Sequence, residues 1–226
     1  TNKVFKNRKL NPVKVKGKAK LIEIKEILYK RPEFNYEVAY RMIEDFLINH
    51  LPKEYTYHTI YHIRDVVVQS ERIAKKEKIN KEDIADLKLA AWLHDVGYIW
   101  EPARHEGRGA EYATTVLNAL DFPAQKINRI TGMIMATKIP QSPKNLLEQI
   151  ICDADLDYLG REGYEENSLL LLQELRLKKE VTELDWLKIQ DQFLTKHAYF
   201  TKTSNATRNK LKADVLANIK SKLKNK

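Results

Sequence analysis

Helical periodicity of apolar residues runs along most of this 226-residue chain and is the feature that most constrains its fold. Within residues 56–76, for example, Ile63, Val66 and Ile73 fall on one face of a helix. The chain contains only seven Gly and seven Pro, the residues that most often interrupt helices. The pattern therefore predicts an all-α fold, a helical bundle long enough to bury one large core.

The predicted helices share apolar positions three or four residues apart, with Pro, Gly or polar stretches between them. They cover residues 21–29, 36–48, 56–76, 81–96, 106–120, 124–137, 143–153, 164–179, 183–197 and 204–223. The segment 81–96 is predicted to be strongly amphipathic and to stop at Gly97. Thr182 followed by Asp185 predicts a helix N-cap.

The positive charge is concentrated at the two ends of the chain. Residues 1–20 hold eight Lys or Arg and no acidic residue, while residues 209–226 hold six Lys and one Asp. Because the whole chain carries +9, residues 21–208 carry −4. We predict a basic, flexible tail over residues 1–20 and a single helical domain over 21–226. The tail could bind an anionic partner weakly, or it could simply be solvated.

Cysteine content and hydropathy indicate a cytoplasmic protein. Cys152 is the only cysteine, so neither a disulfide framework nor a cysteine-based zinc site is available. The longest leucine run, Leu169 to Leu172, is far too short to span a membrane. The N-terminal residues lack the apolar segment of a secretion signal. These features predict a soluble protein in a reducing compartment, without a prediction of its oligomeric state.

Histidines and carboxylates gather in a pattern that suits a metal ion. Four of the six histidines lie between residues 58 and 105. His58 and His62 share a helix face, and the adjacent His94 and Asp95 end an apolar segment where an unpaired carboxylate would be unfavourable. Imidazole and carboxylate together favour a hard-to-borderline divalent metal. Alternatively, His94 is a core histidine and Asp95 caps the next segment. Further carboxylates follow downstream, at Asp153, Asp155 and Asp157.

The order His62…His94-Asp95…Asp155 resembles the HD superfamily of metal-dependent phosphohydrolases, which are helical proteins with an H…HD…D ligand set. The segments "AAWLHDVGY", "HEGRGAEYA" and "ICDADLDYLGR" agree with that resemblance, which covers roughly residues 45–205. It implies an HD-domain helical bundle with a buried metal site in which these four residues hold the ion. Asp153 and Asp157 remain alternatives to Asp155.

The resemblance also implies hydrolytic chemistry at a divalent metal: Mn, Fe, Mg, Ni or Co, as one ion or as two. The metal would lower the pKa of bound water. Asp95 would be catalytic as well as a ligand, because its second oxygen could bridge to another metal or orient the nucleophile. No histidine occurs between His105 and His197, so the six-ligand site of HD-type oxygenases and of HD-GYP phosphodiesterases is not expected.

A second resemblance concerns the segment "YHTIYH", which is similar to the YH-N-x-x-H motif of class I cyclic-nucleotide phosphodiesterases. In that family the first histidine donates a proton to the leaving oxygen, which implies this role for His58. This chain has Thr59 where that family has Asn, and it lacks a recognisable base pocket. As the alternative, His58 simply forms a hydrogen bond with a nearby carboxylate.

Three further residues are predicted to bind the substrate: His105, Arg108 and Lys138. Together with the metal ligands they predict a phosphohydrolase that cleaves a phosphoester of a nucleotide or another small phosphorylated molecule, as a phosphodiesterase does. One alternative is a nucleotidase or an alarmone-type hydrolase. Another is a metal-binding module that has no activity and regulates a partner.

Overall fold

The computed structural model describes residues 6–9, 25–28 and 34–225, which belong to two units, Thr1–Asn35 and Tyr36–Lys226. In the first unit, strand β1 (Lys6–Lys9) pairs antiparallel with strand β2 (Lys25–Leu28). The rest of the predicted tail lies outside the described residues. The two units divide after Asn35, whereas the sequence placed the start of the helical domain at residue 21.

The helix predicted over residues 21–29 is wrong where the structure describes it, because Lys25–Leu28 form a strand. A helix of about nine residues is marginally stable unless a packed face supports it. Pairing with β1 instead gives this segment inter-strand hydrogen bonds, in a register that sets the Cα atom of Glu26 opposite that of Arg8.

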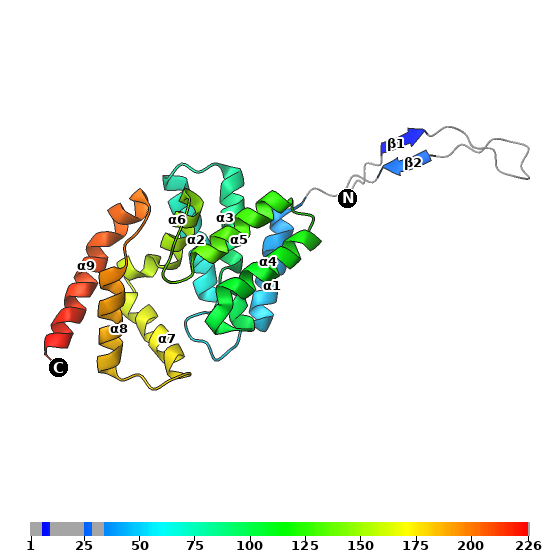
Figure 1. The fold of residues 1–226 in the computed structure, drawn as a ribbon. Helices are drawn as coiled ribbons and strands as arrows, with labels where there is room; N and C mark the ends of the chain where they lie inside the picture. Colours follow the sequence, from blue (N-terminus) through cyan, green and yellow to red (C-terminus); the bar gives the residue numbers. More distant parts are fainter. Residues whose placement is uncertain (1–5, 10–24, 29–33, 226) are drawn as a thin grey trace, which may run out of the picture. The chain divides into compact units, whose positions relative to one another are not determined.

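The second unit confirms the all-α prediction. Its α-helices follow the predicted segments closely and are joined by short connections (Figure 1). They are α1 (Tyr36–His50), α2 (Ile60–Lys76), α3 (Lys81–Leu93), α4 (His105–Ala119), α5 (Ala124–Ala136), α6 (Leu146–Asp155), α7 (Tyr164–Arg176), α8 (Glu183–Lys196) and α9 (Lys202–Lys224). Three short 3-10 helices accompany them: η1 (Val96–Ile99), η2 (Pro102–Arg104) and η3 (Asp157–Gly160).

Helix starts follow the expected side-chain chemistry. The predicted cap at α8 is confirmed: the Thr182 hydroxyl accepts from the Asp185 backbone N–H, and the Asp185 carboxylate accepts from the Thr182 backbone N–H. Asn80 and Asn145 cap α3 and α6 in the same way, each accepting a backbone N–H three residues on.

Helix α3 is the central helix of the second unit and differs from the prediction in two ways. From Asp86 to Leu93 every residue except the partly exposed Lys88 is buried, so this part of the helix is covered on most sides and does not present one apolar and one polar face. It also ends at Leu93, earlier than predicted, and the chain continues through η1. This tighter turn follows directly after His94 and Asp95 and holds both inside the protein.

The helices of the second unit form two groups, one in which α2 and α3 pack with α6 and one that consists of α7, α8 and α9. Helix α2 packs against both α3 and α6, burying Ile63, Val66 and Ile73 completely. Helices α7, α8 and α9 lie together on the other side (Figure 1). A second apolar cluster joins them to η3 and to the segment before α2 through Tyr57, Leu156, Tyr158, Leu159, Tyr164, Leu194 and Ile219. The described part of the chain holds no helix long and apolar enough to cross a membrane.

Candidate metal centre

Three helix ends bring the predicted ligands together. His62 lies in the first turn of α2, His94 follows the last residue of α3, and Asp155 is the last residue of α6. Asp95 comes next to His94, at the start of η1. The negative dipole ends of α3 and α6 favour a cation at this point, whereas the positive dipole end of α2 opposes it.

The ligand atoms lie within contact distance of one another. The Nε2 atoms of His62 and His94 are 3.4 Å apart. Oδ2 of Asp95 is 3.4 Å from His62 Nε2 and 3.2 Å from His94 Nε2. Oδ1 of Asp155 is 3.3 Å from His62 Nε2 and 3.5 Å from His94 Nε2. Each carboxylate therefore faces both imidazole nitrogens.

This donor set fits a divalent metal ion. Atoms that coordinate one first-row metal at about 2.0–2.2 Å lie about 3 Å or slightly more from their neighbours, which matches the observed separations. His94 donates its Nδ1 hydrogen to the Ala91 carbonyl at 2.7 Å, so its Nε2 is left with a lone pair for a ligand. Buried Oδ2 of Asp95 has no hydrogen-bond partner among the described residues, although two histidine nitrogens are close. A cation between these atoms would satisfy all of them.

The electrostatics of the centre also favour positive charge. Burial lowers the pKa of His62, but its contacts with Asp155 and Asp95 outweigh burial and raise that pKa to about 9. Burial also lowers the pKa of His94, but the negative charge of Asp95 and the contact with Asp155 outweigh burial and raise that pKa well above its usual range. Burial raises the pKa of Asp155, yet the two histidines lower it to about 2. Two carboxylates in a closed site thus attract positive charge, which a metal ion can supply in place of protons.

The other two carboxylates of the acidic segment serve the fold. Asp153 accepts hydrogen bonds from the backbone N–H groups of Phe200 and Thr201, each at 2.8 Å, and so holds the start of α9. Asp157 is fully buried and forms ion pairs with three arginines, Arg72, Arg161 and Arg208. Of the three alternatives left open by the sequence, Asp155 is therefore the one that faces the histidines.

His58 is held by a carboxylate from a distant helix. Glu174 of α7 accepts a hydrogen bond from His58 Nδ1, and its second oxygen accepts from the backbone N–H groups of Tyr57 and His58, each at 3.0 Å. The Tyr98 ring stacks on the His58 ring with 4.0 Å between centroids. His58 therefore does form a hydrogen bond with a carboxylate, which was the alternative role considered from the sequence. This hydrogen bond uses Nδ1, so Nε2 of His58 is left for a proton-donor role.

His105 completes the group of histidines around Asp95. Its Nδ1 donates to the Pro102 carbonyl at 2.9 Å, and its Nε2 lies 3.6 Å from Asp95 Oδ1. Asp95 thus faces the two ligand histidines with one oxygen and His105 with the other. The buried carboxylate of Glu106 lies 3.4 Å from the same His105 nitrogen.

A cavity of about 250 Å³ opens beside these residues. His58, Asp95, His105 and Asp155 line one part of it, and aromatic and aliphatic side chains from α7 and α8 line another. A small ligand bound in this cavity could contact the carboxylates of Asp95 and Asp155. Its volume lies near the lower limit of about 300 Å³ that is usual for small-molecule sites.

Two of the predicted substrate contacts, Arg108 and Lys138, are not among the residues that line the cavity. Arg108 is 43 % exposed and pairs with Glu101 and Glu111 on the surface of α4. Lys138 is exposed and, like Arg108, is absent from the described lining of the cavity. The structure therefore gives no support to either as a phosphate contact, whereas His105 does line the cavity.

Sequence reasoning missed Glu174 and Tyr98, which hold His58 from two sides. Tyr98 follows the His-Asp pair closely, so the adjacent motif was an available signal. Glu174 lies more than a hundred residues from its partner, and its local sequence is that of an ordinary amphipathic helix.

Comparison with known proteins agrees with this geometry. Residues 59–157 match the family model described as HD domain, an interval that contains His62, His94, Asp95 and Asp155. No curated protein matches the chain.

Several solved structures share the fold at low sequence identity. A Lactobacillus plantarum structural-genomics target has a TM-score of 0.58 and 20 % identity, over 86 % of this chain and 100 % of that one. A predicted HD superfamily hydrolase from an uncultured Thermotogales bacterium has a TM-score of 0.55 and 20 % identity, over 82 % and 91 %. Bacillus subtilis YpgQ, solved in complex with ADP, has a TM-score of 0.56 and 17 % identity, over 84 % and 96 %.

The family match and the fold likeness converge on the same part of the molecule. The matched interval begins just before α2 and ends at the start of η3, so it includes every helix end that contributes to the metal centre. The likeness to the solved structures extends well beyond that interval. Residues 59–157 of this chain form an HD domain.

Proposed function

We propose that this protein is a metal-dependent phosphohydrolase that cleaves a phosphoester in a small phosphorylated molecule of the nucleotide class. The observation that carries this proposal is the convergence of His62, His94, Asp95 and Asp155 beside a cavity that His58 and His105 also line. One structural neighbour is described as a predicted HD superfamily hydrolase, and this description supports hydrolysis as the reaction.

The metal ligands are the two histidines and two aspartates of the centre. A bound Mn, Fe, Mg, Ni or Co ion would supply Lewis acidity, activating water and polarising a phosphoryl oxygen. Asp95 has a further role, since its Oδ1 faces the cavity side near His105 and can accept a hydrogen bond from the attacking water.

His58 is the group that we assign to proton donation. Because Glu174 binds Nδ1 of His58 and both neighbouring backbone N–H groups, the ring is held in one orientation. A protonated His58 would present Nε2–H to the cavity and could protonate the leaving oxygen. Stacking on Tyr98 restricts rotation of the same ring.

The nucleotide class is supported by cavity size and by one structural neighbour. A cavity of about 250 Å³ favours a ligand with one phosphorylated sugar and one ring over a dinucleotide. One of the structural neighbours, Bacillus subtilis YpgQ, was solved in complex with ADP. A mononucleotide or a nucleoside diphosphate therefore fits the proposal better than a cyclic dinucleotide, and a nucleotidase remains the closest rival to a phosphodiesterase.

A substrate panel with added metals tests this function. Purified protein is incubated with Mn²⁺, Fe²⁺, Mg²⁺, Ni²⁺ or Co²⁺ and with mononucleotides, nucleoside di- and triphosphates, cyclic nucleotides, cyclic dinucleotides and tetraphosphate alarmones. Phosphate release and product chromatography are the readouts. We expect metal-dependent turnover of at least one nucleotide. Tight metal binding without turnover on the whole panel would instead indicate a non-catalytic regulatory module.

A further inference from the structure

A surface pocket of about 410 Å³ lies beside the second half of α8. Its walls come from α8, from the end of α6 and from the connections that follow α5 and α8. Three large apolar side chains that line it are exposed to solvent: Ile139 by 52 %, Phe200 by 38 % and Ile189 by 36 %. Exposed apolar side chains gathered around one pocket are typical of a binding site, and the volume is usual for a small-molecule ligand.

Lys196 gives this pocket a single charge. None of the described residues that line the pocket is acidic, and Lys196 forms no ion pair with any described residue. His197 also lines the pocket, but burial and the nearby Lys212 lower its pKa to about 4, so this ring is uncharged at neutral pH. An unpaired ammonium group beside apolar walls favours a ligand with an anionic head group.

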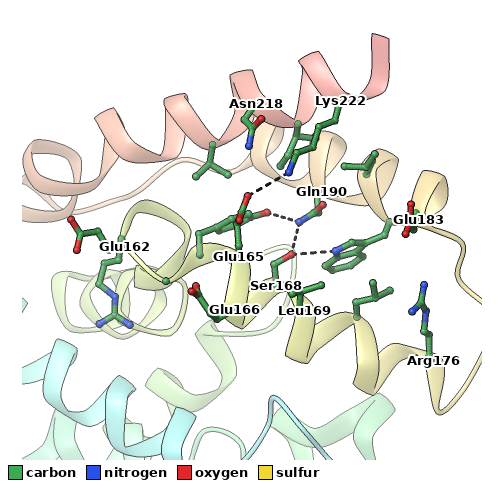
Figure 2. A pocket seen from close by; sticks show the side chains of 18 of the residues that line it. Glu162, Glu165, Glu166, Ser168, Leu169, Arg176, Glu183, Gln190, Asn218 and Lys222 are labelled. Carbon is green, nitrogen blue, oxygen red and sulfur yellow. Dashed lines mark hydrogen bonds and ion pairs between the residues drawn. The ribbon is translucent and has the colours of Figure 1, made fainter. Parts of the chain in front are cut away.

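The larger hollow between α7, α8 and α9 differs in this respect (Figure 2). Its volume is about 970 Å³, and the charged residues that line it have both signs: Glu162, Glu165, Glu166, Glu183, Arg161, Arg176 and Lys222. Lys222 already pairs with Glu165 at 3.4 Å (Figure 2). The charges of this hollow therefore indicate no particular ligand, whereas the single charge at Lys196 does.

The walls of the pocket at Lys196 offer few groups that could form hydrogen bonds. Most of them are apolar: Ile139, Pro140, Leu156, Ile189, Phe193 and Phe200. Gln141 also lines the pocket, but its amide nitrogen donates to the Cys152 carbonyl at 3.2 Å. A nucleotide base would lose hydrogen bonds with water at such walls and gain few in return, whereas a hydrocarbon chain has none to lose.

We propose that this pocket binds a carboxylate that carries a short hydrocarbon chain, with the chain along the apolar walls and the carboxylate paired with Lys196. This ligand goes beyond the proposed reaction, and its binding does not depend on that reaction. Four residues of the pocket also line the cavity at the metal centre: Ile139, Leu156, Ile189 and Phe193. A bound chain would therefore contact residues that the substrate of the metal centre would also contact.

The test compares four probes by isothermal titration calorimetry with the full chain: octanoate, 1-octanol, octylamine and acetate. EDTA is present, so that no metal ion can bind a carboxylate at the metal centre. We expect octanoate to bind about 2- to 5-fold more tightly than 1-octanol, the effect of one partly exposed ion pair, and octylamine to bind most weakly of these three. Acetate should show no measurable binding, because burial of the chain supplies most of the affinity.

The variant Lys196→Met keeps an unbranched apolar side chain and loses the charge, so it should bind octanoate and 1-octanol with nearly equal affinity. Lys188→Met is the matched control, because Lys188 is an exposed lysine of α8 that is not among the residues that line the pocket. It should keep the preference for octanoate. Phe200→Ala removes part of an apolar wall and should weaken the binding of octanoate and 1-octanol by the same factor.

Two results would overturn the proposal: binding of octylamine as tight as that of octanoate in the wild-type protein, or an undiminished preference for octanoate in folded Lys196→Met. The comparison of probes needs no variant, so it decides the matter even if a substitution prevents folding. Because the measurement is made without metal, failure of the proposed phosphohydrolase reaction would leave both results unchanged.

Discussion

The carboxylate of Glu174 binds the ring and the backbone of His58, although 116 residues separate them in the chain. Glu174 is itself buried, and its hydrogen bonds with His58 lower its pKa in spite of burial. Helix α7 therefore fixes the group that faces the metal centre from outside the interval 59–157 that matches the HD-domain family. This contact makes α7 part of the candidate site.

Replacing Glu174 by Gln should impair proton donation more than substrate binding. The amide keeps an acceptor for a backbone N–H but cannot stabilise a protonated His58, so we expect kcat to fall about 10- to 100-fold with KM little changed. The loss should be smaller for an aryl phosphoester, whose leaving group needs no proton. Glu180→Gln, an exposed change, is the control. An equal loss on alkyl and aryl esters would contradict this role.

Removing a ligand should remove the metal. In His94→Ala or Asp95→Ala, we expect metal content measured by mass spectrometry to fall to background and turnover to fall at least about 100-fold. Circular dichroism should show nearly unchanged helix content, because both residues lie at a helix end. His50→Ala removes an exposed histidine of α1 and should keep both properties. Wild-type turnover in either ligand variant would contradict the assignment.

The three neighbouring aspartates should respond differently to conversion to Asn. Asp155→Asn should weaken metal binding with little change in thermal stability. Asp157→Asn should lower the free energy of unfolding by about 3 kcal/mol, because it leaves three arginines around a buried amide, and it should keep the metal. Asp153→Asn should also act on stability, through the start of α9. Metal content and urea denaturation of each variant distinguish these outcomes.

His197 should make the protein less stable in acid. Burial and the nearby Lys212 lower the pKa of His197 to about 4, whereas an unfolded histidine titrates near 6.5. Between these values the unfolded chain binds a proton that the folded chain does not bind, so stability falls as pH falls from about 6.5 to 4. This contribution should amount to about 1–2 kcal/mol at pH 5.

The variant His197→Gln tests that contribution. Urea denaturation at pH 8 and pH 5 should show a smaller stability difference in this variant than in the wild-type protein. The matched control is His50→Gln, which changes an exposed histidine and should leave the pH dependence as it is. An identical pH dependence in His197→Gln and wild type would refute the assignment to His197.

Two glycines near the site should respond to alanine in opposite directions. A Cβ at Gly97 would overlap the backbone carbonyl of His105, so Gly97→Ala should lower the free energy of unfolding by about 1–3 kcal/mol and displace His105. Nothing lies within 4 Å of a Cβ at Gly107 in α4, and Gly107→Ala should raise stability by about 0.5–1 kcal/mol. Urea denaturation and turnover of both variants provide the measurement.

Local patterns were sufficient for most of the fold. Periodicity and caps predicted the helices of residues 36–225 within a few residues, because a helix that buries one stripe carries that stripe in its own sequence. The prediction for residues 21–29 was wrong at β2, where pairing with β1 outweighs a short helical pattern. The amphipathic description of α3 was wrong because its neighbours cover it on most sides, which its own sequence does not report.

The sequence by itself determined which residue types could bind a metal and roughly where they lie: His62, His94, Asp95 and a second carboxylate downstream. Only the tertiary structure decided which of the neighbouring aspartates faces the histidines, because the three differ in partners and not in type. It also left Arg108 and Lys138 out of the residues that line the cavity, and it placed Glu174 against His58. Such contacts depend on how distant helices pack, and no local pattern encodes that packing.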